Sequence, residues 1–198
     1  MVLISKTENA IGDDLPYKDE PIQILPNLYL GSEINAANRS MLNRLNIEFI
    51  LNVGKEVENP YLEEITNVNS SYFADSFHQI SPGLQTNSSV SSEDIPATSD
   101  FKPLKYKKFF WTHNQENLIA DFIPAFAFID EARSAGRNIL VHCQCGVSRS
   151  ASLIISYVMK VNRMTLNQAY EYVKDKSPYI SPNMSLVYQL VEFEKTLK

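Results

Sequence analysis

The sequence predicts an α/β fold, in which a central sheet is flanked by helices. Short β-rich segments alternate with longer segments of helical periodicity along the chain, and a purely helical stretch follows them at the end. Apolar residues make up 44% of the 198 residues and charged residues 21%, a proportion typical of a globular protein with a hydrophobic core. The length suits one ordinary domain plus some irregular material.

The N-terminal quarter predicts a leader followed by the first elements of the domain. Residues 1–20 are polar and show no stable periodicity, so we expect a flexible leader ahead of a domain at 21–198. Pro26 and Asn27 form a turn signal between two short β-rich segments. The elements expected here are strands at 22–25 and 28–31, a helix at roughly 36–45 and a buried strand at 47–53.

The next segment has a different composition. Residues 56–101 contain no Lys or Arg, and 85–99 are rich in Ser, Thr and Asn. Because so few apolar residues cannot offset the entropy of ordering, we predict a disordered, acidic and Ser-rich insert at about 80–100. A basic segment then leads into a strand at 106–110. Its lysines either steer an acidic, phosphorylated partner or protect an exposed edge strand, and these lysines are Lys105, Lys107 and Lys108.

The second half of the chain predicts helices around one further strand. Gly136 is a plausible stop for the first helix, and Pro124 either kinks that helix or marks its true start. The expected elements are a helix at 117–135, a strand at 138–142, a helix at 149–162, a helix that begins at a Thr165–Gln168 capping box, and a last helix capped by Asn183. The predicted buried faces are Leu118, Phe122, Phe126 and Ile129 on the first helix and Leu186, Leu190, Phe193 and Leu197 on the last.

Charge and cysteine content exclude several classes of function. The net charge of −5 disfavours binding to nucleic acid or to an acidic membrane. No apolar run approaches a membrane span and no signal peptide is recognisable, so we expect an intracellular protein, cytoplasmic or nuclear or both, and a monomer. The two cysteines, Cys143 and Cys145, are too close for a comfortable disulfide, and no second pair exists for zinc. We therefore expect no metal and no cofactor.

One segment, His142-Cys143-Gln144-Cys145-Gly146-Val147-Ser148-Arg149-Ser150, carries the main functional signal. A predicted strand delivers Cys143, and a predicted helix begins near Arg149. Backbone N–H groups of the intervening loop, Gln144 to Ser148, can converge on an anion at the positive end of that helix. Gly146 permits the tight turn, and Arg149 adds two forked donors that match phosphate oxygens.

The same surroundings suit a nucleophilic thiolate. Cys143 would attack phosphorus and form a phosphocysteine, with the loop amides and Arg149 holding the phosphate oxygens. Ser150 would donate a hydrogen bond to the sulfur in the second step. His142 would tune or orient Cys143 through hydrogen bonds and would not act as a base. Cys145 either fills space or protects oxidised Cys143. A lone cysteine at the end of a strand is usually a core residue. Here, however, five positions carry the residue types that a phosphate loop requires, namely His142, Cys143, Gly146, Arg149 and Ser150. We therefore predict catalysis or phosphate binding at this loop.

These residues resemble the His-Cys-x5-Arg-Ser loop of the dual-specificity protein phosphatases, and the likeness extends over about 22–197 apart from the insert. The likeness is greatest to the MAP-kinase phosphatases, particularly to fungal ones that have Gln and Cys at the loop positions of Gln144 and Cys145. Further matching segments are Ile24–Gly31, Ile50–Val53, Ser150–Lys160, Ile180–Asn183, Gln189–Leu190 and Phe193–Glu194. The resemblance implies a cysteine-phosphatase fold with a central mixed sheet, a shallow pocket for phosphotyrosine and phosphothreonine or phosphoserine, a supporting role for Asn183, and a MAP kinase in a signalling pathway as the substrate.

One departure from the family pattern concerns the general acid. The family usually places an Asp a few residues before the helix that precedes the loop strand, and Thr112 occupies that position here. His113 and Glu116 are the candidate substitutes; the alternatives are a surface loop residue and a first-turn helix charge. Because a phenolate leaves more easily than an alkoxide, we expect phosphotyrosine hydrolysis to survive better than phosphothreonine hydrolysis.

Three other functions compete with an active protein phosphatase. The missing Asp suggests a weakly catalytic phosphoprotein-binding module, although intact Cys143 and Arg149 favour an enzyme. A phosphoinositide phosphatase or an RNA 5′-triphosphatase would favour basic residues within the loop. The neutral loop side chains Gln144, Val147 and Ser148 therefore argue against both.

Overall fold

The computed structural model describes residues 15–61 and 103–197. The chain divides into two compact units, residues 1–58 with 104–198 and residues 59–103, and every element named below belongs to the first. The predicted insert at about 80–100 lies outside the described residues, as do residues 1–14 of the predicted leader.

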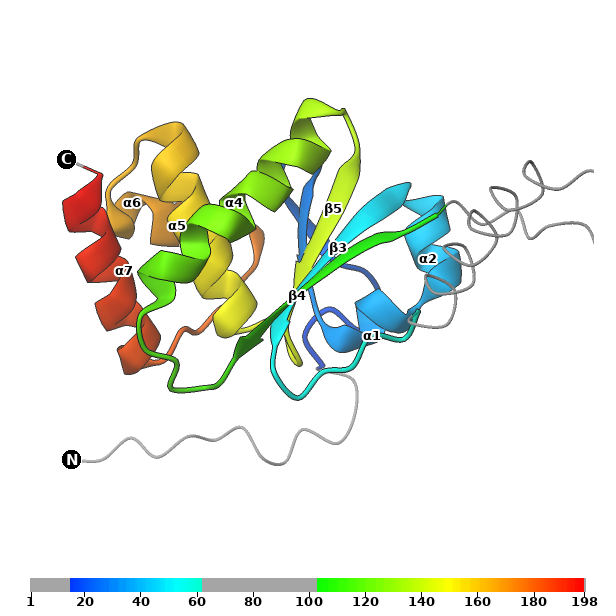
Figure 1. Ribbon diagram of the computed structural model, residues 1–198, viewed down its shortest axis with the longest axis horizontal. Helices are drawn as coiled ribbons and strands as arrows, with labels where there is room; N and C mark the ends of the chain where they lie inside the picture. The colour runs from blue at the N-terminus through cyan, green and yellow to red at the C-terminus, as the bar shows by residue number, and fades with distance from the viewer. Residues whose placement is uncertain (1–14, 62–102, 198) are drawn as a thin grey trace, which may run out of the picture. The chain divides into compact units, whose positions relative to one another are not determined.

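Five strands form one mixed sheet (Figure 1). In spatial order they are β1 (Ile22–Leu25), β2 (Leu28–Gly31), β5 (Asn138–His142), β3 (Ile47–Gly54) and β4 (Lys105–Trp111). The hairpin β1–β2 is antiparallel, and each remaining neighbour pair is parallel. Each strand lies where the sequence predicts it; continuous apolar residues mark the buried strand β5, whereas β4 at the sheet edge has lysines at its centre. The predicted α/β fold with a mixed sheet is confirmed.

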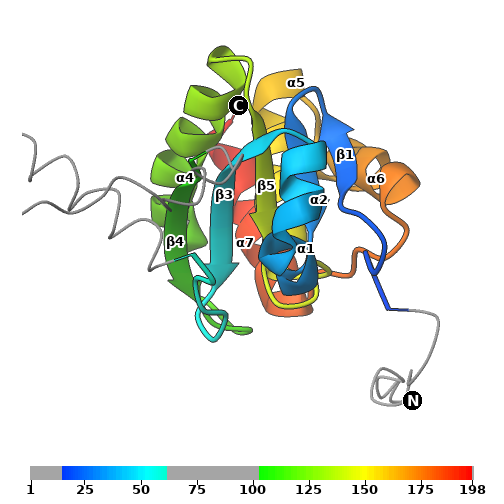
Figure 2. The ribbon, with the colours of Figure 1, turned by 90° about the vertical axis from the view of Figure 1, so that its right-hand side faces the viewer.

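Helices cover both faces of this sheet (Figures 1 and 2). One face carries α4 (Leu118–Ser134), α5 (Arg149–Asn162), α6 (Leu166–Lys176) and α7 (Met184–Thr196), and the other carries α1 (Glu33–Ala37) and α2 (Arg39–Arg44). The prediction of a single helix at 36–45 is wrong. Asn38 ends α1, and its side chain accepts a hydrogen bond from the backbone N–H of Met41, which caps the start of α2.

The hydrophobic core holds the start of α5 in a fixed place. All α5 residues from Arg149 to Met159 are buried between the sheet and the surrounding helices. Rings from α4 and α7 pack on the same side, with Phe122 and Phe193 centroids 5.0 Å apart. The predicted buried faces of α4 and α7 are confirmed except at Leu197, which is 41% exposed because α7 ends at Thr196. Pro124 lies inside α4 and does not mark its start.

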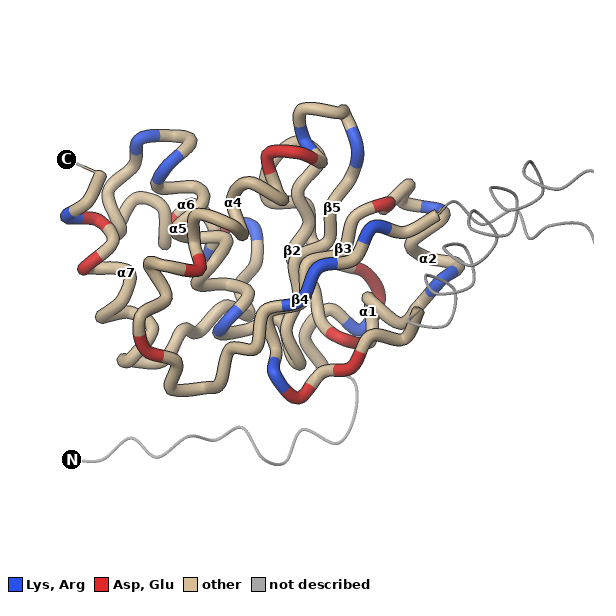
Figure 3. The backbone as a smooth tube through the Cα atoms, viewed as in Figure 1, with Lys and Arg blue, Asp and Glu red and all other residues tan. Residues whose placement is uncertain are grey.

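The lysines of β4 are bound to neighbouring parts of the fold, and they give this strand the run of positive charge seen in Figure 3. Lys105 pairs with Glu131 of α4, and Lys107 Nζ donates to the carbonyl of Pro124 at 3.1 Å. Lys108 lies on the opposite face of the strand and donates to the carbonyl of Val57 at 2.7 Å. All three side chains thus make contacts within the domain, whether or not they also attract a partner.

The described residues show neither a membrane-spanning helix nor a cluster of metal-binding side chains. Across 15–61 and 103–197, no helix combines the length and the apolar character needed to cross a bilayer. Those residues also include no group of three or more His, Cys, Asp or Glu side chains placed to hold a metal ion.

Candidate active site

The predicted phosphate loop, Cys143–Ser148, connects the end of β5 to the start of α5. Gly146 lies in its middle with φ of +76°, a conformation that side chains other than glycine rarely adopt. A Cβ atom at Gly146 would lie 2.5 Å from the carbonyl oxygen of Gly31, at the end of β2. The neighbouring strand therefore determines how closely the loop folds back, and glycine is required at this position.

The loop turns its carbonyl groups outward. The carbonyl of Gln144 accepts from the N–H of Glu33 at 3.0 Å, and that of Val147 accepts from the N–H of Ser181 at 2.8 Å. The carbonyl of Gly146 accepts from the Tyr17 hydroxyl at 3.2 Å. Among the described residues, no protein acceptor pairs with the backbone N–H groups of 144–148. Outward carbonyls with unpaired amides are the arrangement that the predicted anion site requires.

Cys143 and Ser150 lie together beneath this loop. The Cys143 side chain is buried, at 2% exposure, and its Sγ lies 3.2 Å from the Ser150 Oγ. Ser150 is in the first turn of α5 and is fully buried. The structure therefore brings the predicted nucleophile and the predicted sulfur partner into contact.

Arg149 is held next to them and is 1% exposed. Its Nη1 donates to Glu56 Oε2 at 2.7 Å and to the Trp111 carbonyl at 2.9 Å, and its Nη2 donates to Glu56 Oε1. Burial alone would lower the pKa of Arg149, but the Glu56 hydrogen bonds and the charge of Cys143 raise it above its usual value. The guanidinium is thus a permanent positive charge beside the sulfur.

His142 supports the loop from within the sheet. Its Nδ1 lies 3.2 Å from the Cys143 carbonyl oxygen, and because a carbonyl only accepts, this contact places a proton on Nδ1. Burial lowers the pKa of His142 to about 4, so the ring is neutral at physiological pH. A neutral ring that contacts the Cys143 backbone is consistent with the predicted orienting role.

Cys145 differs from Cys143 in exposure and chemistry. Its side chain is exposed, whereas that of Cys143 is buried. Partial desolvation, together with the nearby Cys143 and Glu33, raises the pKa of the Cys145 thiol. Its redox role stays a prediction, and the raised pKa lowers the fraction of reactive thiolate at neutral pH.

The residues predicted as substitute acids lie in the β4–α4 connection, residues 112–117. Thr112, His113 and Glu116 are all exposed there. The Nδ2 of Asn183, the residue that caps α7, donates to the His113 carbonyl at 2.7 Å. Arg149 is the main cause of the lowered pKa of Glu56, and His113 makes a smaller electrostatic contribution, so this connection borders the Arg149 pair. Asn183 therefore supports the backbone of the connection, which is consistent with a supporting role outside the reacting groups.

Sequence reasoning missed Glu56, the partner of Arg149. Glu56 follows the end of β3, which lies next to β5 in the sheet and runs parallel to it. Because the carboxyl ends of parallel strands meet at one edge of a sheet, a carboxylate just beyond β3 was a signal for a partner of Arg149.

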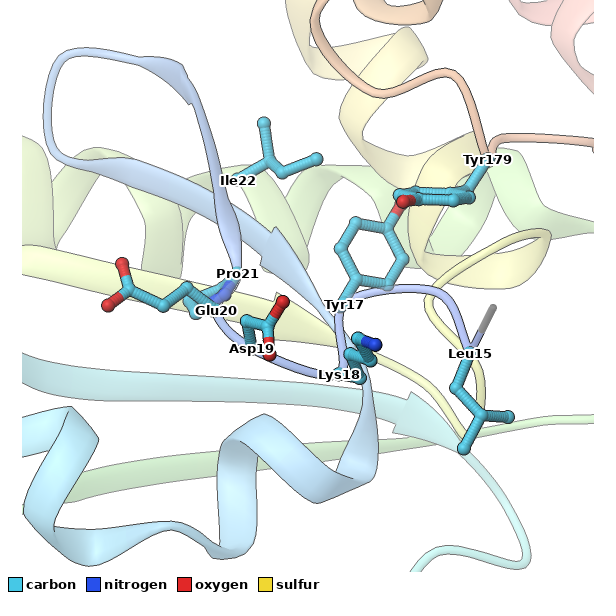
Figure 4. Close-up of a pocket in the computed structure, with 8 residues that line it drawn as sticks. All are labelled: Leu15, Tyr17, Lys18, Asp19, Glu20, Pro21, Ile22 and Tyr179. Atoms are coloured by element: carbon cyan, nitrogen blue, oxygen red, sulfur yellow. The ribbon is translucent and has the colours of Figure 1, made fainter. Parts of the chain in front are cut away.

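Tyr17 was also missed, because it lies in the polar stretch assigned to the leader. Its side chain is 3% exposed, and its hydroxyl lies 2.7 Å from Ser177 Oγ as well as bonding the Gly146 carbonyl. Figure 4 shows its ring facing Tyr179 at a shallow pocket, with the two centroids 5.5 Å apart. Residues 15–20, within the predicted leader, therefore include a support for the phosphate loop.

Comparison with known proteins identifies the family of this chain. A family model described as the dual specificity phosphatase catalytic domain matches residues 28–196. Human dual specificity protein phosphatase 9 is 35% identical over 178 residues, which cover 90% of this chain and 37% of the human protein. Tyrosine-protein phosphatase MSG5 of Saccharomyces cerevisiae is 36% identical over 178 residues, which cover 89% of this chain and 29% of the yeast protein.

The fold has close structural neighbours as well. The crystal structure of human DUSP28 superposes with a TM-score of 0.67 at 22% identity, covering 93% of this chain and 99% of that one. This chain spans only a minor part of the length of the two curated relatives above. The matched family model nevertheless covers most of this chain, which therefore belongs to the dual specificity phosphatase family through its catalytic domain.

Proposed function

We propose that this chain is a cysteine-dependent phosphatase that removes phosphate from phosphorylated protein side chains. One observation carries the proposal: Cys143 Sγ lies 3.2 Å from Ser150 Oγ beneath a loop that turns its carbonyls outward, beside a buried arginine. Convergent amides and a guanidinium stabilise charge on three phosphate oxygens, and a sulfur beneath them is placed for attack in line with the ester bond.

In the first step, the Cys143 thiolate forms a bond to phosphorus as the ester P–O bond breaks. The departing oxygen keeps the bonding electrons and takes a proton from a nearby acid or from water. The loop N–H groups and Arg149 hold the three remaining oxygens throughout. The product of this step is a phosphocysteine and a free tyrosine or threonine side chain.

In the second step, a water oxygen attacks phosphorus and the S–P bond breaks. The Ser150 hydroxyl donates a hydrogen bond to the sulfur, which stabilises the thiolate as it leaves. The water gives up one proton, inorganic phosphate is released, and Cys143 returns to its starting state.

The loop side chains support a protein substrate. Gln144, Val147 and Ser148 are neutral, whereas a substrate with several phosphates would favour basic groups there. The relatives named above are called dual specificity and tyrosine-protein phosphatases, which agrees with phosphotyrosine and phosphothreonine or phosphoserine as substrates. The resemblance to MAP-kinase phosphatases supports a phosphorylated MAP kinase as the target.

Turnover by Cys143→Ser separates an enzyme from a phosphoprotein-binding module. The wild-type chain should hydrolyse a phosphotyrosine peptide, and Cys143→Ser should lose at least about 10³-fold of that activity while still binding the peptide. Equal activity of the two proteins, or binding without turnover by the wild type, would contradict the proposal.

A second measurement addresses substrate preference. Phosphotyrosine should be hydrolysed faster than phosphothreonine when each is the single phosphorylated residue of a MAP-kinase activation-loop peptide, because the connection at 112–117 contains no Asp. Equal rates on the two peptides, with an acidic group visible in the pH profile, would refute this preference.

A further inference from the structure

The turn after β3 carries the residue that holds Arg149. Glu56 lies in this turn, Gly54–Val57, and its carboxylate binds both terminal nitrogens of the guanidinium. The Arg149 side chain is buried, whereas the Glu56 side chain is 39% exposed. A buried arginine at the start of α5 is therefore held by a carboxylate from the turn after β3.

Counting the five N–H groups of Arg149 shows which remain for a ligand. Nη1 uses both of its hydrogens, one on Glu56 and one on the Trp111 carbonyl, and Nη2 uses one on Glu56. The Nε–H is buried and has no hydrogen-bond partner within the described residues. The Nε–H and the second hydrogen of Nη2 share one edge of the planar group, and two such donors match two oxygens of a phosphate.

The turn that carries Glu56 is itself fixed by β3 and β4. The Val57 carbonyl accepts from Asn52 Nδ2 at 2.8 Å and from Lys108 Nζ at 2.7 Å. The N–H of Gly54 donates to Asn52 Oδ1 at 2.7 Å, and the N–H of Lys55 donates to the Trp111 carbonyl at 3.1 Å. The position of the Glu56 carboxylate is thus set by the sheet.

We propose that Glu56 is a positioning residue for the phosphatase reaction: it holds the Nη1–Nη2 edge of Arg149 so that the Nε–Nη2 edge is presented to the phosphate. This inference rests on the proposed function of the Cys143 site. The hydrogen bond from Arg149 lowers the pKa of Glu56 to about 2, so the pair stays ionised throughout the pH range in which such a reaction is measured.

A carboxylate this close to an anion site can also oppose the binding of phosphate. It would compete with phosphate for Arg149 if both used the same edge of the guanidinium. The hydrogen-bond pattern separates the two edges, so the positioning role predicts weaker oxyanion binding when Glu56 is lost. Competition predicts tighter binding, and the sign of the change therefore decides between the two roles.

The test compares Glu56→Gln with Glu58→Gln, an exposed glutamate two residues further on. With p-nitrophenyl phosphate as substrate, Glu56→Gln should lower kcat/KM by about 10- to 100-fold because the guanidinium of Arg149 loses its orientation. The inhibition constant of tungstate should rise by a similar factor, and Glu58→Gln should stay within about twofold of wild type on both measures. Glu56→Asp keeps the charge but has a shorter reach, and should recover part of the loss.

A double-mutant cycle distinguishes positioning of Arg149 from a merely structural role of Glu56. In an Arg149→Lys background there is no second guanidinium edge to present, so Glu56→Gln should change tungstate binding by less than about threefold. Unchanged kinetics in Glu56→Gln, tighter tungstate binding, or an equal effect in both backgrounds would overturn the inference. Should Glu56→Gln fail to fold, Glu56→Asp and its combination with Arg149→Lys answer the same question.

Failure of the proposed function would look different. In that case the wild-type chain itself would show no turnover that depends on Cys143. A wild type with Cys143-dependent turnover and a Glu56→Gln variant of equal efficiency would reject the positioning role alone.

Discussion

The phosphate loop and the β4–α4 connection both approach Arg149, but the fold holds them in different ways. The loop is fixed through its carbonyls by α1, by the Tyr17 segment and by the stretch before α7. The connection is mostly exposed; the Asn183 side chain bonds the carbonyl of His113, and the Gln115 side chain bonds the backbone of Thr112 and Glu116. The groups proposed to act on phosphorus are therefore preorganised, whereas the groups proposed to protonate a leaving group lie on an exposed backbone segment.

The largest expected effect tests how rigidly the loop is packed. Gly146→Ala should lower the free energy of unfolding by about 4 kcal/mol, because strain at φ of +76° adds to a clash with the Gly31 carbonyl. Gly136→Ala is the matched control, since Gly136 has φ of +66° and nothing within 4 Å of an added Cβ. It should cost only about 1 kcal/mol in urea denaturation. Equal losses in the two variants would show that the loop has room to relax.

Acid denaturation offers a second test of the buried region. The pKa of His142 is about 4 in the folded chain and about 6.5 when unfolded, so its contribution to stability is complete above pH 6.5 and falls as the pH drops towards 4. The expected loss is about 3 kcal/mol by pH 4. As the pH drops, urea midpoints should fall less steeply in His142→Gln than in wild type. A ring resonance of His142 that shifts near pH 6.5 would contradict this.

A smaller effect is expected from the contact between Ser150 and the sulfur. Ser150→Ala should slow the second step about 10- to 100-fold, because the leaving thiolate loses a hydrogen bond, and phosphocysteine should then accumulate. The measurement is a pre-steady-state burst of p-nitrophenol, approaching one equivalent per site. Ser156→Ala is the control, since its hydroxyl donates to Leu153 within the same helix. A burst in neither variant would remove Ser150 from the second step.

The smallest effects should come from the connection. His113→Gln and Glu116→Gln should each change phosphotyrosine hydrolysis by less than about threefold, because a phenolate needs little protonation to leave. The same variants are to be measured with the phosphothreonine peptide. A loss of about 100-fold in phosphothreonine hydrolysis, with the basic limb of the pH profile abolished, would identify the substituted residue as the general acid. The β4–α4 connection would then be as important for that substrate as the phosphate loop.

The sequence predicted the elements that rest on local patterns. All five strands, the helix starts at Arg149, Thr165–Leu166 and Asn183–Met184, and the stop at Gly136 follow from periodicity, caps and a glycine. The proposed roles of Cys143 as nucleophile and of Arg149 as phosphate ligand also come from the sequence, because residues 142–150 form one continuous motif. The break at Asn38 was missed because the spacing of apolar residues there allows one helix as well as two.

Residues that act across the fold could not be predicted in the same way. Glu56 meets Arg149 across 93 positions of the chain, and Tyr17 meets Gly146 across 129. No local periodicity reports such a pairing; only the strand order, with β3 next to β5, makes the first one foreseeable. The general acid could not be predicted for a different reason: an exposed side chain is not part of the pattern of buried apolar residues from which elements are predicted.

The Trp111 carbonyl receives hydrogen bonds from both Lys55 and Arg149, and the Trp111 ring is buried with its Nε1 bound to Asp121 at 2.7 Å. The last residue of β4 is therefore tied both to the turn after β3, through Lys55, and to the guanidinium of Arg149. A change of conformation confined to the exposed residues beyond it would begin at Thr112, and if it displaced His113 it would break the hydrogen bond from Asn183.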